Sequence, residues 1–281
     1  MAEMKENAEK VNFNAEENGE ETKEKMKSSA KNVQLTSFDE LFYANKMDFV
    51  LEKEIDKLIP FQGHPFQIKE DEEMEKLVKS IAEQGVVVPG IARPIDGEYF
   101  ELIAGHRRRY ACMKLGIKTM PVLIKRLDDD EATIAMVDSN LQREHILPSE
   151  RAFSYKMKLE AIKHQGKRTD LTSGQVVQKL KDKNSVEIVA EEAGESYKQI
   201  QRYIRLTKLL PELLQMVDNN RLKFNTGVEL SYLEAEEQIS LHKFMERLNA
   251  IPSLEQASKL KKYSQEKNFN DAVIEIILTE E

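Results

Sequence analysis

The spacing of apolar residues between positions 51 and 127 predicts a small domain that mixes helices with strands. One apolar stripe at i, i+3, i+4 and i+7 predicts a helix that Gly85 ends, and its members are Met74, Leu77, Val78 and Ile81. A second helix is expected over 106–115, because no helix breaker occurs before Gly116.

Strands are expected between and after these two helices. The runs 86–93 and 98–104 are apolar or β-favouring, and the Asp96-Gly97 dipeptide between them is a strong hairpin signal. A third strand is expected at 120–125. The pattern therefore predicts an α/β unit over 51–127 whose sheet includes these three strands.

From residue 128 onward the periodicity is helical to the end of the chain. Pro148 is expected to begin a helix at its first turn, and further amphipathic helices follow Pro211. Between them we expect a loop at 166–170, a short helix near 176–180, and helices at 186–193 and 196–206. The fold class is thus mixed α+β, with the chain divided into an arm (1–50), the α/β domain (51–127), a helical domain (128–233) and a C-terminal helical segment (234–281).

The composition of the 281 residues excludes several classes of protein. No stretch approaches 18 consecutive apolar residues, and the N-terminus runs into polar, acidic sequence instead of a signal region, so we expect a cytoplasmic protein with no membrane partner and a disordered arm. The single Cys112 excludes a disulfide framework and a cysteine-built zinc or iron–sulfur site, and neither haem nor flavin is expected. The acids from Asp128 to Glu131 are expected to stabilise a helix start rather than to bind a metal.

The net charge of −8 is not spread evenly along the chain. Residues 156–183 carry eight lysines and arginines against three acids, so this stretch forms a local basic field. The overall acidity therefore does not exclude a nucleic-acid ligand.

The segment 186–206 has the spacing of a helix-turn-helix motif. Such a motif needs a small residue where the helices meet, a glycine at the turn and an apolar anchor six residues later, and Ala190, Gly194 and Ile200 fill these positions. With Ile200 facing inward, one outward stripe would hold Lys198, Arg202 and Arg205, flanked by Ser196, Gln199 and Gln201. These side chains suit base edges and phosphates in the major groove. The alternative is an ordinary helical hairpin with a solvated charged face.

A second cluster of candidate residues follows the strand at 98–104. Gly105 precedes His106, Arg107 and Arg108 at the expected start of a helix, where free backbone N–H groups, the helix dipole and forked guanidinium groups favour an anion such as phosphate. Taken alone, this pattern is equally typical of a solvated surface face.

Four stretches together make the chain resemble the ParB family of partition proteins. They are residues 59–67, 78–89, 104–111 (AGHRRRYA) and 139–148 (SNLQREHILP), with a helix-turn-helix after them. The resemblance covers about residues 52–233. It implies a ParB/sulfiredoxin-like α/β domain followed by an all-α helix-turn-helix domain and C-terminal helices.

What the resemblance implies is a nucleotide-gated clamp on DNA. Its N-terminal domain would bind CTP with Mg²⁺, and its helix-turn-helix would bind a palindromic site on double-stranded DNA as a homodimer that a ParA-type ATPase moves. Carried over by position, Gly105, Arg107 and Arg108 would hold the triphosphate beside His106, and Asn140 would lie by the magnesium. Gln142 and Arg143 belong to the same motif as Asn140.

The sequence departs from the family pattern where the family has carboxylates. His106 and Ser139 each replace a Glu, and Phe66 stands where the family often has Arg. Carboxylates hold magnesium and orient water in phosphoryl transfer, so we expect at most weak CTP hydrolysis. Asp138, one residue before Ser139, is a candidate substitute.

Two other classes of protein remain as alternatives. One is a helix-turn-helix transcription regulator or a nucleoid-occlusion-type factor without nucleotide gating. The other is an enzyme of the sulfiredoxin or serine-kinase type, which is disfavoured because His106 replaces the reactive cysteine that a sulfiredoxin needs, and because a metabolite enzyme needs no helix-turn-helix. The helices over 234–281 are expected to supply a self-association surface.

Overall fold

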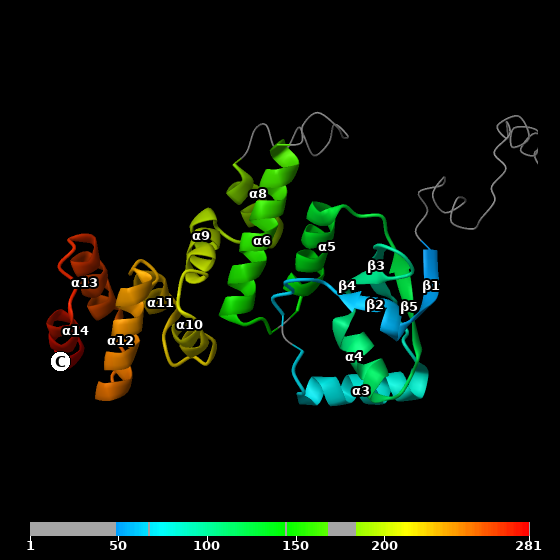
Figure 1. Cartoon of the computed structure of the whole chain (residues 1–281), viewed down its shortest axis with the longest axis horizontal. Helices are drawn as coiled ribbons and strands as arrows, with labels where there is room; N and C mark the ends of the chain where they lie inside the picture. The colour runs from blue at the N-terminus through cyan, green and yellow to red at the C-terminus, as the bar shows by residue number, and fades with distance from the viewer. Residues whose placement is uncertain (1–48, 67, 144, 168–183, 281) are drawn as a thin grey trace, which may run out of the picture. The chain divides into compact units, whose positions relative to one another are not determined.

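The computed structural model describes residues 49–66, 68–143, 145–167 and 184–280 (Figure 1). The arm up to residue 48 and the short helix expected near 176–180 lie outside these ranges. Phe49 and Val50, which the sequence assigned to the arm, belong to the first strand.

The N-terminal half is built on a five-stranded mixed sheet in the order β1-β5-β3-β4-β2. The strands are β1 (Phe49–Glu54), β2 (Leu58–Pro60), β3 (Gly90–Pro94), β4 (Phe100–Ala104) and β5 (Thr119–Ile124), and a 3-10 turn, η1 (Ile55–Lys57), joins the first two. β1 and β5 pair antiparallel, as do β3 and β4, while β3 pairs parallel with β5 and β2 with β4. The mixed α+β class is therefore confirmed.

The predicted hairpin is present, but its first strand is shorter than expected. β3 begins at Gly90, and residues 86–89 are not in the sheet. Val87 and Val88 are 71% and 63% exposed. The guanidinium of Arg108 donates hydrogen bonds to the carbonyls of Val88 and Pro89, which a neighbouring strand would otherwise bind. The strands β1 and β2 carried no hairpin signal and were not predicted.

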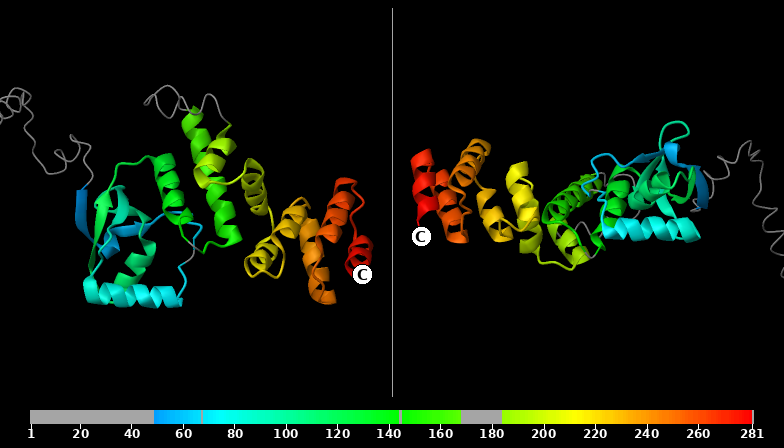
Figure 2. Two further views of the ribbon diagram at one scale, coloured as in Figure 1. Left: turned by 180° about the vertical axis from the view of Figure 1, so that it is seen from behind. Right: turned by 90° about the horizontal axis from the view of Figure 1, so that it is seen from below.

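Two helices lie together at one side of this sheet, and a third packs against β4 (Figures 1 and 2). The first two are α3 (Glu72–Gln84) and α4 (His106–Lys114), which contact each other, and the third is α5 (Asp129–Leu141). Gly85 ends α3 with a φ of 72°, as the sequence predicted. Asp128 caps α5 in a reciprocal capping box with Glu131, which accounts for acids at this position.

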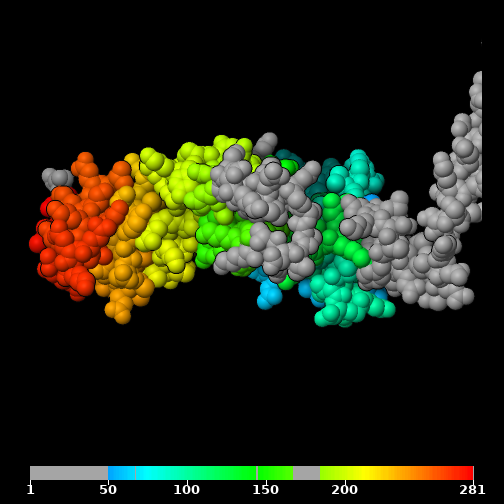
Figure 3. Space-filling view, turned by 90° about the horizontal axis from the view of Figure 1, so that it is seen from above, coloured from blue at the N-terminus to red at the C-terminus, as the bar shows by residue number. Residues whose placement is uncertain are grey.

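The rest of the described chain is helical. Its elements are α6 (Pro148–Lys167), α8 (Ser185–Ala193), α9 (Tyr197–Leu206), α10 (Pro211–Asp218), α11 (Phe224–Leu230), α12 (Ala235–Leu248), α13 (Leu254–Gln265) and α14 (Asp271–Thr279). α6 continues through Gly166 to Lys167, where the sequence predicted a loop. From α9 onward the helices follow one another in chain order, as the yellow-to-red surface in Figure 3 shows.

Among the described residues, three apolar clusters join helices to one another and to β4. One joins Ile103 of β4 to α5, and a second joins α6 to α8 and α9 around Val189 and Ile200. The third runs from Leu206 at the end of α9 to Leu278 on α14. The last cluster includes side chains before and after residue 233, so the helical domain and the C-terminal segment share one core. Cys112 is fully buried, as expected for a small apolar residue.

We predict that Gly227→Ala destabilises this third cluster. A Cβ at position 227 would lie 2.8 Å from Cγ2 of Val217 and 3.3 Å from Cδ2 of Leu206, closer than carbon atoms pack. Overpacking of this kind costs about 1–3 kcal/mol of the free energy of unfolding, which urea denaturation measures. Asn225→Ala, on the exposed side of the same helix, is the control. Equal stability of the two variants would contradict the tight packing of α9 and α10 against α11.

Candidate nucleic-acid interface and anion site

The pair α8 and α9 has the geometry of a helix-turn-helix. Gly194 ends α8 in the left-handed conformation, with a φ of 65°, and the Ser196 side chain accepts a hydrogen bond from the Gln199 backbone N–H at the start of α9. Ala190 and Ile200 are 4% and 0% exposed. The three spacings that the sequence suggested therefore do place a small residue, a turn and an anchor between two packed helices.

The outer face of α9 presents the polar residues that the sequence predicted. Ser196, Lys198, Gln201 and Arg202 are exposed, and Gln199 is half-buried. Within the described ranges, neither Lys198 nor Arg202 makes an ion pair, so both cations face solvent without a carboxylate to neutralise them.

Arg205 differs from the other two cations of the predicted stripe. Its Nε donates to Oγ of Ser231 at 3.1 Å and its guanidinium donates to the Ser231 carbonyl at 2.7 Å. The same guanidinium lies 4.1 Å from the centre of the Tyr232 ring. The stripe therefore turns toward the C-terminal end of α11 instead of ending in solvent.

The arginine-rich turn begins α4, as predicted, with Gly105 at a φ of 105°. A Cβ there would lie 3.1 Å from Cα of Gly90, so this position favours glycine by both conformation and space. Its arginines are engaged within the fold: Arg107 pairs with Asp71 at 2.9 Å and with Glu73 at 3.2 Å, and Arg108 binds backbone carbonyls.

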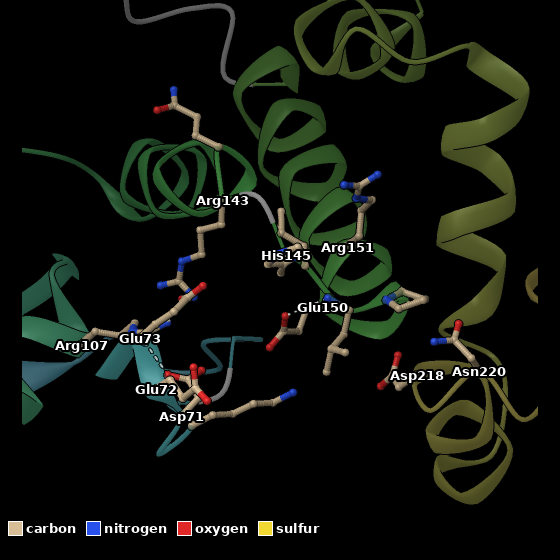
Figure 4. A pocket seen from close by; sticks show the side chains of 15 residues that line it. Asp71, Glu72, Glu73, Arg107, Arg143, His145, Glu150, Arg151, Asp218 and Asn220 are labelled. Atoms are coloured by element: carbon tan, nitrogen blue, oxygen red, sulfur yellow. Dashed lines mark hydrogen bonds and ion pairs between the residues drawn. The ribbon is translucent and has the colours of Figure 1, made fainter. Parts of the chain in front are cut away.

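A cavity of roughly 1030 Å³ opens beside this turn (Figure 4). Arg107, Gln142 and Arg143 line it, whereas the predicted ligands Gly105, His106, Arg108 and Asn140 do not. Its charged lining residues are Lys69, Arg107, Arg143 and Arg151 against Asp71, Glu72, Glu73, Glu150 and Asp218. An anion that binds Arg107 must therefore compete with Asp71 and Glu73.

His106 is part of the core instead of the cavity wall. Its side chain is 7% exposed, its Nε2 accepts the Phe61 backbone N–H at 3.4 Å, and its ring lies 4.1 Å from that of His64. Burial, together with His64, Arg143 and Arg109 nearby, lowers the pKa of His106 to about 3. The imidazole is therefore neutral at pH 7 and links the start of α4 to the chain after β2.

Ser139 and Asn140, which begin the second predicted motif, lie in the last turn of α5. Asn140 is 3% exposed, and its amide Nδ2 donates to the Met136 carbonyl at 2.8 Å. Oγ of Ser139 donates to the same carbonyl at 2.9 Å. Asp138 pairs with Lys158, so the candidate substitute carboxylate is already bound on the side toward α6.

Sequence reasoning did not find two further contacts at this site. The guanidinium of Arg143 lies 5.3 Å from the centre of the Phe66 ring, which places it in cation–π contact with that ring. Phe66 stands where the resembled family often has Arg, so at this position an aromatic ring contacts an arginine from another part of the chain. Asp71, which caps α3 by accepting the Met74 N–H at 2.8 Å, also binds Arg107. The cap was visible as an acid before a helix, but its partner lies 36 residues away.

The described ranges contain no group of three or more His, Cys, Asp or Glu side chains placed to hold a metal ion. In the same ranges, no helix combines the length and the apolar character needed to cross a bilayer.

Comparison with known proteins identifies residues 43–141 as a ParB N-terminal domain. A nucleoid occlusion protein of Listeria innocua is 32% identical over 190 residues, which are 67% of this chain and 60% of the relative. The chain thus spans about three fifths of that relative's length.

Two solved structures of ParB from Caulobacter crescentus are also similar. The truncated chromosome-partitioning protein complexed to the centromeric parS site is 21% identical and covers 75% of this chain and 98% of its own, with a TM-score of 0.44. The same truncated protein complexed with CTP-gamma-S is 25% identical and covers 69% and 97%, with a TM-score of 0.32.

The buried His106 predicts a pH dependence of stability. In the unfolded chain His106 binds a proton as the pH falls below the ordinary histidine pKa of 6.5. In the folded protein it binds this proton only near pH 3. The free energy of unfolding should therefore fall as the pH falls through this window, with a contribution of up to about 1.4 kcal/mol per pH unit.

His106→Gln should remove this part of the slope in urea unfolding measured between pH 7 and pH 4.5. His145→Gln, which replaces an exposed histidine, should retain it. An unchanged slope in His106→Gln would mean that the imidazole is not buried in its neutral form.

Proposed function

The chain belongs to the ParB family through its N-terminal domain, residues 43–141, and from this premise we propose that it is a partition protein that binds double-stranded DNA under the control of a nucleotide. The observation that carries the proposal is the exposed, unneutralised pair Lys198 and Arg202 on the second helix of a helix-turn-helix. A recognition helix in the major groove needs such groups, because arginine binds guanine edges and both cations bind phosphates. Gln199 and Gln201 are suited to adenine.

The proposed form of the DNA-binding protein is a homodimer. A two-fold symmetric dimer matches a palindromic site, with one recognition helix in each half-site. The proposed partner that moves the complex is a ParA-type ATPase, and its place is the cytoplasm of a bacterium, on the nucleoid or on a plasmid. These expectations come from the resemblance to the family.

The proposed nucleotide site is the cavity beside the arginine-rich turn. Arg107 and Arg143 supply cationic groups to it, and Arg107 stands in the first turn of α4, which begins at His106. The donor set therefore fits a triphosphate, and the family resemblance favours CTP among the nucleotides. Binding requires Arg107 to exchange Asp71 and Glu73 for phosphate oxygens.

The protein groups fit magnesium less well than they fit phosphate. Magnesium prefers oxygen ligands, especially carboxylates and phosphates, and keeps several waters. At the family positions this chain offers a histidine, a serine and the amide of Asn140, whose nitrogen binds its own helix. A metal bound with the nucleotide would thus be held mainly by phosphate oxygens and water, because Asn140, which the resemblance places by the magnesium, is buried and does not line the cavity. We accordingly propose tight retention of the nucleotide and at most weak hydrolysis.

A second candidate function is nucleoid occlusion or transcription regulation, which the similarity to the Listeria innocua protein favours. Deletion of the gene separates the two functions. Loss of a plasmid or chromosome from daughter cells supports partition, whereas normal inheritance with septa placed across the DNA supports nucleoid occlusion. A neighbouring gene for a ParA-type ATPase also favours partition.

We predict that Arg202→Ala weakens binding to the specific DNA site by about 1–3 kcal/mol, because it removes a base or phosphate contact without disturbing the buried face of α9. The site is first selected from a random duplex library, and fluorescence anisotropy then gives the dissociation constants. Arg221→Ala, an exposed arginine outside α8 and α9, is the control. Unchanged affinity in Arg202→Ala would remove this side chain from the reading stripe.

We also predict that Arg107→Ala abolishes nucleotide binding while leaving nucleotide-free DNA binding intact. Calorimetric titration with CTP, ATP and GTP in the presence of Mg²⁺ measures the first, and anisotropy the second. Glu73→Gln should bind the nucleotide more tightly than the parent, because it removes a carboxylate that competes for Arg107. Normal CTP affinity in Arg107→Ala would contradict the site, and selective CTP binding with rapid phosphate release by the parent would contradict weak hydrolysis.

A further inference from the structure

An exposed aromatic ring between two cations lies beyond the C-terminal end of the recognition helix. Tyr232, just after α11, is 40% exposed. The guanidinium of Arg205 lies 4.1 Å from the ring centre, and Nζ of Lys261 on α13 lies 3.8 Å from it. The two cations that contact this ring, Arg205 on α9 and Lys261 on α13, are 56 residues apart in the chain.

The arrangement is held in place by buried contacts. Ser231 is 1% exposed and accepts Nε of Arg205 while its own hydroxyl donates to the Val228 carbonyl at 2.7 Å. α11 packs closely on α13, which fixes Lys261 relative to Tyr232 (Figure 1). The cations therefore cannot move apart freely, although their mutual repulsion would favour it.

This cluster continues the cationic stripe of α9. Lys198, Arg202 and Arg205 follow one another at i, i+4 and i+7, and Arg205 is the residue that contacts Tyr232. Lys208, exposed just after α9, lines a cavity of about 420 Å³ together with Arg205 and Tyr232. Positive groups thus extend from the proposed reading face to α13, with the acids Glu229 and Glu234 beside them.

We propose that Tyr232 and Lys261, with Arg205, form a second DNA contact that binds backbone phosphates beyond the bases read by α9. The proposal rests on the proposed DNA binding. Lysine and arginine bind phosphate by charge, and a tyrosine ring that holds their charged ends in place lowers the entropy lost on binding. Glu229, which pairs with Lys261 at 3.1 Å, is the group that a phosphate replaces.

The neighbouring residue on α13 provides a matched control. Lys262 pairs with Glu266 at 3.8 Å, its side chain is 74% exposed, and within the described ranges its amine lies over no aromatic ring. Lys261→Gln and Lys262→Gln therefore remove the same charge from adjacent positions, and Glu229→Gln and Glu266→Gln remove their carboxylate partners. Within each pair the change in net charge is the same, so a difference in DNA affinity between the two variants reflects the position of the charge.

The experiment measures binding of the full chain to a random-sequence 24-base-pair duplex by fluorescence anisotropy over a range of salt concentrations. Each lost phosphate contact lowers the slope of log affinity against log salt by about 0.9 and weakens binding at 0.1 M salt roughly eightfold. We expect this change in Lys261→Gln and not in Lys262→Gln. Glu229→Gln should bind more tightly than Glu266→Gln.

The role of the ring is tested in the same assay. Tyr232→Phe should retain the parent slope, whereas Tyr232→Ala should lose part of it. Identical slopes for Lys261→Gln, Lys262→Gln and the parent would overturn the second contact while leaving DNA binding by α9 intact. No DNA binding by the parent chain would overturn the proposed function and this contact with it.

Discussion

The helical half of the molecule depends on Lys158, a buried cation on α6. Its side chain is 4% exposed, and its amine pairs with Asp138 on α5 and, at 2.8 Å, with Glu192 on α8. Burial alone would lower the pKa of Lys158, but the hydrogen bonds that its amine donates to both carboxylates raise it above its ordinary value. A buried ammonium is tolerated only with such partners. One charge therefore fixes α6 between α5, which ends in the motif around Asn140, and α8, the first helix of the helix-turn-helix.

The arginine-rich turn obeys a second constraint, since its charges are neutralised or hydrogen-bonded before any ligand arrives. Arg107 faces Asp71 and Glu73, and Arg108 faces carbonyls of the chain before β3. A ligand gains only the difference between its own contacts and those it replaces. Under the proposed function the turn is a site of ligand exchange, because a bound nucleotide would take Arg107 from Asp71 and Glu73. The Asp71 oxygen that binds Arg107 also accepts the Met74 N–H, so one carboxylate both caps α3 and holds the arginine.

Local patterns predicted most of the elements, and long-range partners escaped prediction. The stripe of Met74 and Ile81, the Asp96-Gly97 turn and the glycine at 194 all act within one element or between neighbours, so their spacing in the sequence carried the information. β1 and β2 take their places through β5 and β4, which lie far along the chain, and their own short runs carry no turn signal. Arg205 was placed correctly on α9 by periodicity, but its contacts with Ser231 and Tyr232 come from a helix that no periodicity links to α9.

The histidine at position 106 shows how a family site changes when its carboxylate is lost. A glutamate at the start of α4 would bring a negative charge next to the phosphates, where it could hold a metal. His106 instead turns into the core, accepts the Phe61 N–H and lies with its ring tilted against that of His64, and its pKa of about 3 keeps it uncharged. It neither adds a donor to the cavity nor repels an anion from it. Under the proposed function, the histidine at this position would remove a catalytic carboxylate and keep the start of α4 next to the phosphates, which would separate nucleotide binding from hydrolysis.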